Sequence, residues 1–282
     1  SNVDVGSSSQ LESRDRASLQ LLGTPNQPIE FSSRSDSAIR PVQGQSINDS
    51  NIDAIQMPTG PYVRGSQWGG IVLREDSDAG LPGVFLNSLQ YATLSYGGGQ
   101  VIVDSQPDFF SAIQIESTRP SLSNNVITVN ANAGIAATPN SFFEDSERIG
   151  VVLSGNTILE NTIDGLLIDI RTEFGVPVET LDVDARFTST EVVYVLQENL
   201  LITGGAGGYL ENADGQTEVR PSGRLKIDPG VIVKLQNSRI ELEHGPAQLV
   251  AEGHETKPII FTSLNDHRFG AGGGFNTNGG QD

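Results

Sequence analysis

Residues 122–135 read Leu-Ser-Asn-Asn-Val-Ile-Thr-Val-Asn-Ala-Asn-Ala-Gly-Ile, and residues 153–166 read Leu-Ser-Gly-Asn-Thr-Ile-Leu-Glu-Asn-Thr-Ile-Asp-Gly-Leu. The second stretch repeats five residues of the first at one offset, since 153 − 122 = 31 and 165 − 134 = 31. After the leading leucine, the repeated positions are Asn125, Ile127, Asn130 and Gly134 in the first stretch, and Asn156, Ile158, Asn161 and Gly165 in the second. A fixed offset of this size indicates a chain that coils and stacks on itself.

Stacked coils explain which residue types repeat. Short strands point alternate side chains inward, and parallel coils lie ~4.8 Å apart, so aliphatic side chains at matching positions form an internal column. Asparagine at a turn can repeat in the same way, because its amide can bond to the coils above and below. We therefore predict an all-β fold, a right-handed parallel β-helix (a solenoid) with loop excursions. The alternative is two unrelated strand-turn units of a β-sandwich, which five matches at one offset disfavour.

Composition favours the same fold. The chain has 32 glycines and only 18% charged residues, and its short Val/Ile/Leu runs are interrupted by Gly, Asn, Asp and Pro. This pattern is typical of many strands joined by turns. The chain has no cysteine, and a long stacked solenoid needs no disulfides.

Charge and hydropathy exclude two classes of partner. The net charge is −18, from 35 acidic and 17 basic residues, whereas binding to nucleic acid needs clustered Lys and Arg. No stretch approaches the ~18 to 20 apolar residues of a membrane span, so we expect no membrane insertion.

A second repeat joins the two ends of the chain. Residues 23–36 match residues 253–266 at an offset of 253 − 23 = 230. The matched positions include Gly23, Pro28, Ile29 and Phe31 near the start, and Gly253, Pro258, Ile259 and Phe261 near the end. This offset predicts one unit of a tandem array within a single β-helix segment. We expect the end of one unit and a variable loop over 1–60, central coils over 61–170, a loop excursion or irregular insert over 171–200, and coils that begin the next unit over 201–282.

Three further runs resemble a known group of proteins. They are 223–235 (Gly-Arg-Leu-Lys-Ile-Asp-Pro-Gly-Val-Ile-Val-Lys-Leu), 257–263 (Lys-Pro-Ile-Ile-Phe-Thr-Ser) and 67–73 (Gln-Trp-Gly-Gly-Ile-Val-Leu). These runs resemble the β-helix segments, of the pectate-lyase-like superfamily fold, in giant bacterial secreted and cell-surface repeat proteins. The resemblance implies an extracellular or cell-surface location. The resemblance does not indicate a single function, since β-helices serve as adhesins, fibres, lyases and glycosidases.

One motif points towards an enzyme. The run Asn161-Thr-Ile-Asp164-Gly165 resembles the Asn-Thr-Asp element of polygalacturonases, with an extra isoleucine that would move the aspartate to the other strand face. Glycoside hydrolysis needs two carboxyl groups that flank the bond, and the companion motifs are absent from the sequence. We interpret Asp164 as a turn residue of the repeat and predict no catalytic residues.

Two acidic runs are candidates for Ca²⁺. Asp76 and Asp78 alternate in Asp-Ser-Asp-Ala-Gly, and Asp214 lies in Asn-Ala-Asp-Gly. Oxygen ligands on alternate residues suit a hard cation, although the same residues are ordinary turn formers. Calcium is the one cofactor that the sequence suggests.

The sequence therefore favours a structural, non-catalytic protein. We expect a repeat unit of a cell-surface fibre, filament or adhesin that stacks end to end, because an uncapped parallel edge can pair with a further strand. The alternative is a polysaccharide-binding or polysaccharide-degrading module, a lyase or hydrolase, with surface glycans as its partners.

Overall fold

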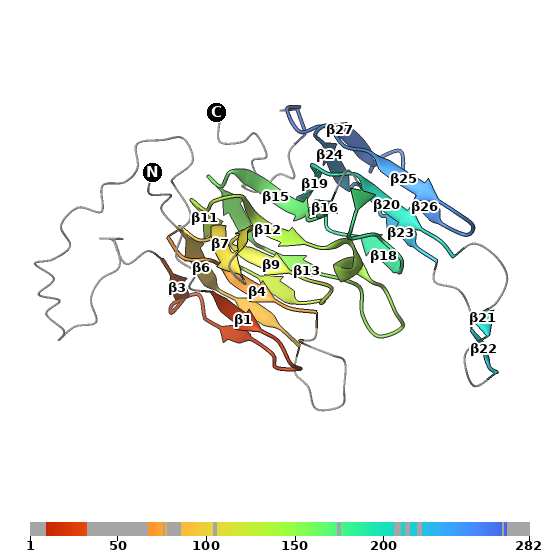
Figure 1. The fold of residues 1–282 in the computed structure, drawn as a ribbon. Coiled ribbons are helices and arrows are strands. Elements are labelled where there is room, and N and C mark those ends of the chain that lie inside the picture. The colour runs from red at the N-terminus through yellow and green to blue at the C-terminus, as the bar shows by residue number, and fades with distance from the viewer. Residues whose placement is uncertain are drawn as a thin grey trace, which may run out of the picture.

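The computed structural model describes residues 10–32, 67–75, 77, 86–103, 106–173, 176–205, 210–211, 215–218, 222–266 and 268–269. These residues form an elongated stack of short strands, with the N-terminal strands at one end and the C-terminal strands at the other (Figure 1). Apart from one turn of 3-10 helix, η1 (Pro139–Phe142), the regular elements of the described residues are β-strands. The predicted all-β class is confirmed.

One parallel sheet runs along the whole stack. In spatial order its strands are β1 (Leu11–Ser13), β4 (Ile71–Leu73), β9 (Ile113–Ile115), β12 (Ala133–Ala137), β15 (Ile163–Ile168), β19 (Val193–Leu196), β24 (Ile232–Leu235) and β27 (Ile260–Ser263). Every neighbouring pair is parallel. Between consecutive strands the chain leaves this sheet and returns to it, so each strand opens a new coil. The arrangement is consistent with a parallel β-solenoid.

Two further parallel sheets complete the coils of the first half, from β1 to β14. One contains β2 (Gln20–Leu22), β5 (Ser88–Gln90), β10 (Ser121–Ser123) and β13 (Val152–Ser154). The other contains β3 (Ile29–Phe31), β6 (Ala92–Ser95), β11 (Val126–Thr128) and β14 (Thr157–Leu159). The corner between these two sheets has a positive φ in three successive coils, at Tyr91 (48°), Asn124 (54°) and Gly155 (64°). Asparagine and glycine tolerate this conformation, which explains Asn124 and Gly155 at this corner, just before the repeated Asn125 and Asn156.

The second half, from β15 to β27, has side sheets of its own. One contains β18 (Asp184–Phe187), β23 (Arg224–Ile227) and β26 (Gln248–Ala251), and the other contains β20 (Leu200–Thr203) and β25 (Ile240–Glu243). No described strand continues the first-half sheets beyond β13 and β14. Instead, Phe143 forms an antiparallel bridge to Ala185 of β18. Of the sheets that the described residues form, the eight-stranded sheet alone connects the two halves.

Alternate side chains of the strands point inward and form columns. One column of the eight-stranded sheet contains Leu11, Ile71, Ile113, Ile135, Leu166, Tyr194, Val233 and Phe261. Its members from Ile71 to Val233 are buried, whereas Phe261 at the end is 45% exposed. Each column is thus buried by the coils above and below it, as the stacking argument requires.

Three aromatic side chains fill the core where the side sheets change. The ring centroids of Phe187 and Tyr194 lie 4.3 Å apart in a stacked arrangement, and those of Phe142 and Phe187 lie 4.8 Å apart in a T-shaped arrangement. On the outside, Arg186 pairs with Glu144 of the first half at 2.8 Å and with Asp228 of the second at 2.9 Å. The two halves are therefore joined by an aromatic cluster inside and by an ion-pair chain outside.

The outward face of the eight-stranded sheet is also largely buried. Its central column contains Val72, Gln114, Ala136, Leu167, Val195 and Lys234, each at most 6% exposed. The hairpin of β7 (Gly99–Val103) and β8 (Gln106–Phe110) packs Val101 and Phe110 against Val72. Strands that are buried on both faces read as continuous apolar runs, as in Ile71–Leu73.

The predicted excursion over residues 171–200 is shorter in the structure. The antiparallel strands β16 (Thr172–Glu173) and β17 (Val176–Pro177) leave the stack, but Leu181 already forms a parallel bridge to Ile202. The following β18 and β19 lie in the stacked sheets. In β18 the outward Asp184 and Arg186 alternate with the buried Ala185 and Phe187, the usual pattern of a strand with one buried face. A second small hairpin, of β21 (Leu210–Glu211) and β22 (Thr217–Glu218), follows β20.

Candidate functional site

Two ladders of asparagine side chains run through the first half. Nδ2 of Asn125 donates to Oδ1 of Asn156 at 2.9 Å, and Nδ2 of Asn130 donates to Oδ1 of Asn161 at 2.9 Å. Each of these donors also bonds to a backbone carbonyl of the preceding coil, and all four side chains are buried. Ile127 and Ile158, which pair directly, lie between the ladders. The structure thus places the repeated residues in the interior, where they join successive coils.

Asp164 is the last acceptor of the second ladder, and it lies in the same coil as Asn161. Its Oδ1 accepts hydrogen bonds from the backbone N–H and from Nδ2 of Asn161, both at 2.8 Å. A β-bulge permits this contact: Ala133 pairs with Ile163 and Ile135 pairs with Leu166, so Asp164 and Gly165 together face Gly134. Burial raises the pKa of Asp164, while the hydrogen bonds from Asn161 lower it. The residue that resembles a catalytic aspartate is thus the terminal acceptor of the ladder.

The raised pKa of Asp164 predicts a pH-dependent stability. For a carboxyl group whose pKa is higher in the folded than in the unfolded chain, stability is largest below the unfolded value of about 3.9. It then falls as the pH rises through the folded value. We expect Asp164→Asn, which cannot ionise, to gain stability relative to the wild type between pH 4 and pH 7. Urea unfolding at both pH values tests this, with the exposed Asp15→Asn as control. Parallel pH profiles for wild type and Asp164→Asn would contradict the prediction.

Two more carboxyl groups with raised pKa lie outside the eight-stranded sheet. Burial raises the pKa of Glu116, and its two oxygens accept hydrogen bonds from Arg74 at 3.0 and 2.9 Å. Burial also raises the pKa of Asp169, which accepts a 2.5 Å hydrogen bond from Gln114. Sequence reasoning missed this pair because the two residues lie 53 positions apart (169 − 116), with no motif around either. Each carboxyl group accepts hydrogen bonds from a side chain of another coil.

The three calcium candidates, Asp76, Asp78 and Asp214, lie outside the described residues. Within the described part of the chain, no group of three or more His, Cys, Asp or Glu side chains is placed to hold a metal ion. Calcium binding therefore stays a prediction from the sequence.

The residues of the 230-residue repeat form the same turn at both ends of the stack. The backbones of Thr24 and Gln27 exchange hydrogen bonds of 3.1 and 3.0 Å, and those of His254 and Lys257 exchange bonds of 3.1 and 2.9 Å. Gly23 and Gly253 precede these turns, and Pro28-Ile29 and Pro258-Ile259 follow them. The next strands differ in place, since β3 with Phe31 lies in a side sheet and β27 with Phe261 lies in the eight-stranded sheet. The repeat therefore returns to the same local structure on another side of the stack.

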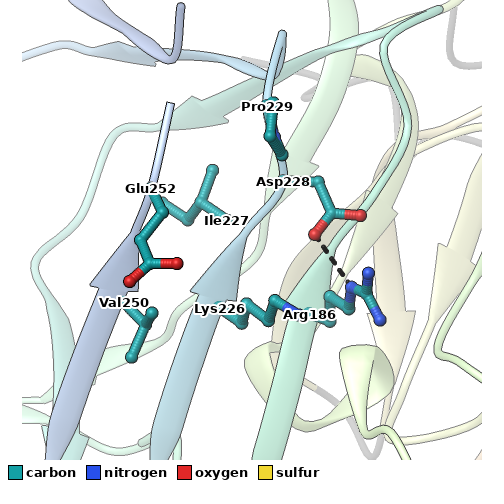
Figure 2. Close-up of a pocket in the computed structure, with 7 residues that line it drawn as sticks. All are labelled: Arg186, Lys226, Ile227, Asp228, Pro229, Val250 and Glu252. Atoms are coloured by element: carbon teal, nitrogen blue, oxygen red, sulfur yellow. Dashed lines mark hydrogen bonds and ion pairs between the residues drawn. The ribbon is translucent and has the colours of Figure 1, made fainter. Parts of the chain in front are cut away.

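A hollow of about 250 Å³ lies on the outward face of β18, β23 and β26 (Figure 2). Its charged side chains come from three successive coils: Arg186 on β18, Lys226 and Asp228 on and after β23, and Glu252 after β26. Arg186 and Asp228 form the ion pair drawn in Figure 2, and Pro229 and Val250 supply apolar surface. Among the described residues, Lys226 forms no ion pair.

A larger hollow, of about 450 Å³, lies where the first-half coils leave the eight-stranded sheet. Its polar lining includes Glu75, Arg119, Asn140, Arg148 and Asp182. Arg119 binds Asp145 at 2.7 Å and lies over the ring of Phe143, 4.8 Å from its centroid. The hydrogen bond from Arg119 holds the pKa of Asp145 well below its usual range. Nδ2 of Asn140 donates to Asp182 at 2.8 Å. These contacts fix the lining side chains in place.

No protein-family model, no curated protein and no solved structure matches this chain. The described residues include no helix that is long and apolar enough to cross a membrane.

Proposed function

We propose that this chain is a structural, non-catalytic segment of a right-handed parallel β-helix in a bacterial secreted or cell-surface protein. Its role is that of a rigid repeat unit in a fibre, filament or adhesin, joined end to end with further coils. The long parallel sheet supports the fold. The resemblance of residues 223–235 and 257–263 to giant surface proteins supports a place in a bacterial secreted or cell-surface protein.

The observation that carries this proposal is a continuous apolar interior that is open at both ends of the described stack. Leu242 pairs with the buried Ile202, and Phe261 pairs with the buried Val233, so both side chains point inward. They are nevertheless 51% and 45% exposed. At the other end, the inward-facing Leu21 is only half-buried. A further coil at either end would bury such side chains and pair the strand edges.

End-to-end association is therefore expected to depend on the exposed core residues. We expect Phe261→Lys to weaken self-association about tenfold or more, because it removes one buried aromatic contact and places a charge in the joint. Sedimentation velocity over a range of protein concentrations measures this, and electron microscopy shows whether the particles are rods joined at their ends.

The matched control is Phe109→Lys, because Phe109 is 65% exposed on the β7–β8 hairpin, away from both ends. This variant should associate like the wild type. A wild-type chain that stays monomeric at every concentration, or association that Phe261→Lys leaves unchanged, would contradict the proposal. Turnover of an anionic polysaccharide by the purified chain would favour the enzymatic alternative.

A further inference from the structure

We propose that two copies of this chain join head to tail, with β27 of one copy paired in parallel with β1 of the next. In this joint, Leu11 of the second copy lies opposite Phe261 of the first, and Glu12 lies opposite Thr262. The pairing rests on the proposed end-to-end association, to which it adds the partner strand, the direction and the register.

The free edge of β27 offers backbone groups of known phase. The N–H groups of Ile260 and Leu264 donate to carbonyl oxygens of the preceding coil, both at 3.0 Å. Alternate residues of a parallel strand bond to opposite neighbours. Phe261 and Ser263 therefore present their N–H and C=O groups to the free side of the sheet.

The free edge of β1 has the opposite phase. The N–H of Leu11 donates to the carbonyl of Gly70 at 3.1 Å, and the carbonyl of Ser13 accepts from the N–H of Arg74 at 2.9 Å. These two residues of β1 thus bond towards β4. Glu12, which lies between them, presents its N–H and C=O to the free side.

The two edges are complementary in the proposed register. With Glu12 of the second copy opposite Thr262, its N–H can donate to the carbonyl of Phe261, and its carbonyl can accept from the N–H of Ser263. Ile260 has the same relation to β24, because it lies opposite Ile232 and donates to the carbonyl one residue earlier. The joint would therefore repeat the hydrogen bonding of the pairs inside the sheet.

The same register continues the inward column. Val233 and Phe261 end this column at one end of the stack, and Leu11 and Ile71 begin it at the other. Phe261 is 45% exposed and Leu11 is half-buried, so each can cover the other in the joint. A shift by one residue would place Phe261 opposite a polar side chain of β1 and turn the apolar side chains of one copy outward.

A joint between two like ends cannot reproduce this arrangement. Such a joint has a twofold axis, which either reverses the direction of the partner strand or turns its inward face outward. All seven pairs of the eight-stranded sheet are parallel and share one inward face. Only the head-to-tail joint keeps both properties.

The C-terminal end of the described stack is stepped, and this makes β27 the first strand to meet a partner. The last described strands of the side sheets, β25 and β26, come before β27 and lie one coil lower. Sixteen residues follow Asp266 (282 − 266), twice the eight residues of Ser121–Thr128 that supply both side strands of an inner coil. The chain is therefore long enough to complete the coil that β27 begins.

Disulfide cross-linking of single-cysteine variants tests the pairing, since the chain has no cysteine of its own. Neighbouring strands lie ~4.8 Å apart, within the Cα separation of about 4.4–6.8 Å that a disulfide spans. An equimolar mixture of the Glu12→Cys and Thr262→Cys chains is oxidised with diamide and followed by non-reducing gel electrophoresis. We expect a cross-linked dimer to form at least about tenfold faster than in the control mixture, because the joint holds the two thiols at a high effective concentration.

The control mixture replaces Glu12→Cys by Glu30→Cys, the same change at an exposed position of β3 at the same end of the stack. Each variant alone should stay without cross-links. Equal rates in the two mixtures, or equally fast cross-linking of Thr262→Cys alone, would overturn the pairing. Sedimentation velocity separates this outcome from failure of the proposed function. A wild-type chain that associates, with variants that associate but do not cross-link, overturns the pairing alone, whereas a wild-type chain that stays monomeric overturns the end-to-end association as well.

Discussion

Asn130→Ala is expected to lower the free energy of unfolding by about 2–5 kcal/mol, because it leaves buried backbone groups without partners. Oδ1 of Asn130 accepts from the N–H of Gly97 at 2.8 Å, and its Nδ2 donates to the carbonyl of Leu94 at 3.1 Å and to Asn161. All of these contacts lie in the interior, so water cannot replace the lost bonds. Urea unfolding followed by circular dichroism measures the loss.

The double variant tests whether the asparagines act as a ladder. Asn130 and Asn161 share hydrogen bonds, so Asn130→Ala with Asn161→Ala should cost less than the sum of the two single changes. Asn265→Ala, at an exposed position after β27, is the control and should stay within about 0.5 kcal/mol of the wild type. Additive costs would show that the two asparagines act independently and not as a ladder. A loss for Asn130→Ala no larger than for Asn265→Ala would show that the asparagine does not stabilise the stack.

The repeat could be predicted only where two successive coils match in length, since each of the strands β10, β11 and β12 pairs with a strand 31 residues later, at Leu122 and Leu153, Ile127 and Ile158, and Ile135 and Leu166. Between Ile127 and Ile158 the offset of 31 residues is the register of β11 and β14, and the side chains that repeat are those that point inward or bond between coils. Identical environments in neighbouring coils select identical residues, and this is why the ladder is visible as a sequence repeat.

The second half keeps no such period. Along the inward column, the steps from Leu166 to Tyr194, Val233 and Phe261 are 28, 39 and 28 residues, from 194 − 166, 233 − 194 and 261 − 233. Hairpins of different length leave the coils and hide the repeat. No sequence pattern marks the change of side sheets after β14, because the change depends on which distant segments pair with one another.

The two side hollows were also beyond prediction from sequence. Their lining residues come from segments as distant as Glu75 and Glu252, and nothing local distinguishes Lys226 from any other lysine on a strand. Only the stacking of coils brings a cation and a carboxylate of different coils to one hollow. Asp164 shows the opposite case: a local motif resembled a catalytic element, but the bulge turns its carboxylate towards Asn161.

Phe187→Ala is expected to destabilise the second half by about 3–5 kcal/mol, the usual cost of removing a buried phenylalanine ring. Phe187 stacks on Tyr194 at 4.3 Å and contacts Phe142 at 4.8 Å, at the point where only the eight-stranded sheet continues through the described stack. Because each coil is stabilised mainly by its neighbours, a cavity at this junction should uncouple the halves as well as weaken them.

Two probes can separate these effects. Trp68, the single tryptophan, stacks on Phe31 at 5.5 Å and donates to the carbonyl of Ser95, so its fluorescence reports the first half. Circular dichroism reports both halves. For Phe187→Ala we expect part of the dichroism to be lost at a lower urea concentration than the fluorescence change, whereas coincident curves indicate one cooperative unit. Phe109→Ala, which removes an exposed ring, should keep the wild-type curves. If Phe187→Ala also unfolds in one step with a wild-type midpoint, the aromatic cluster is not what couples the two halves.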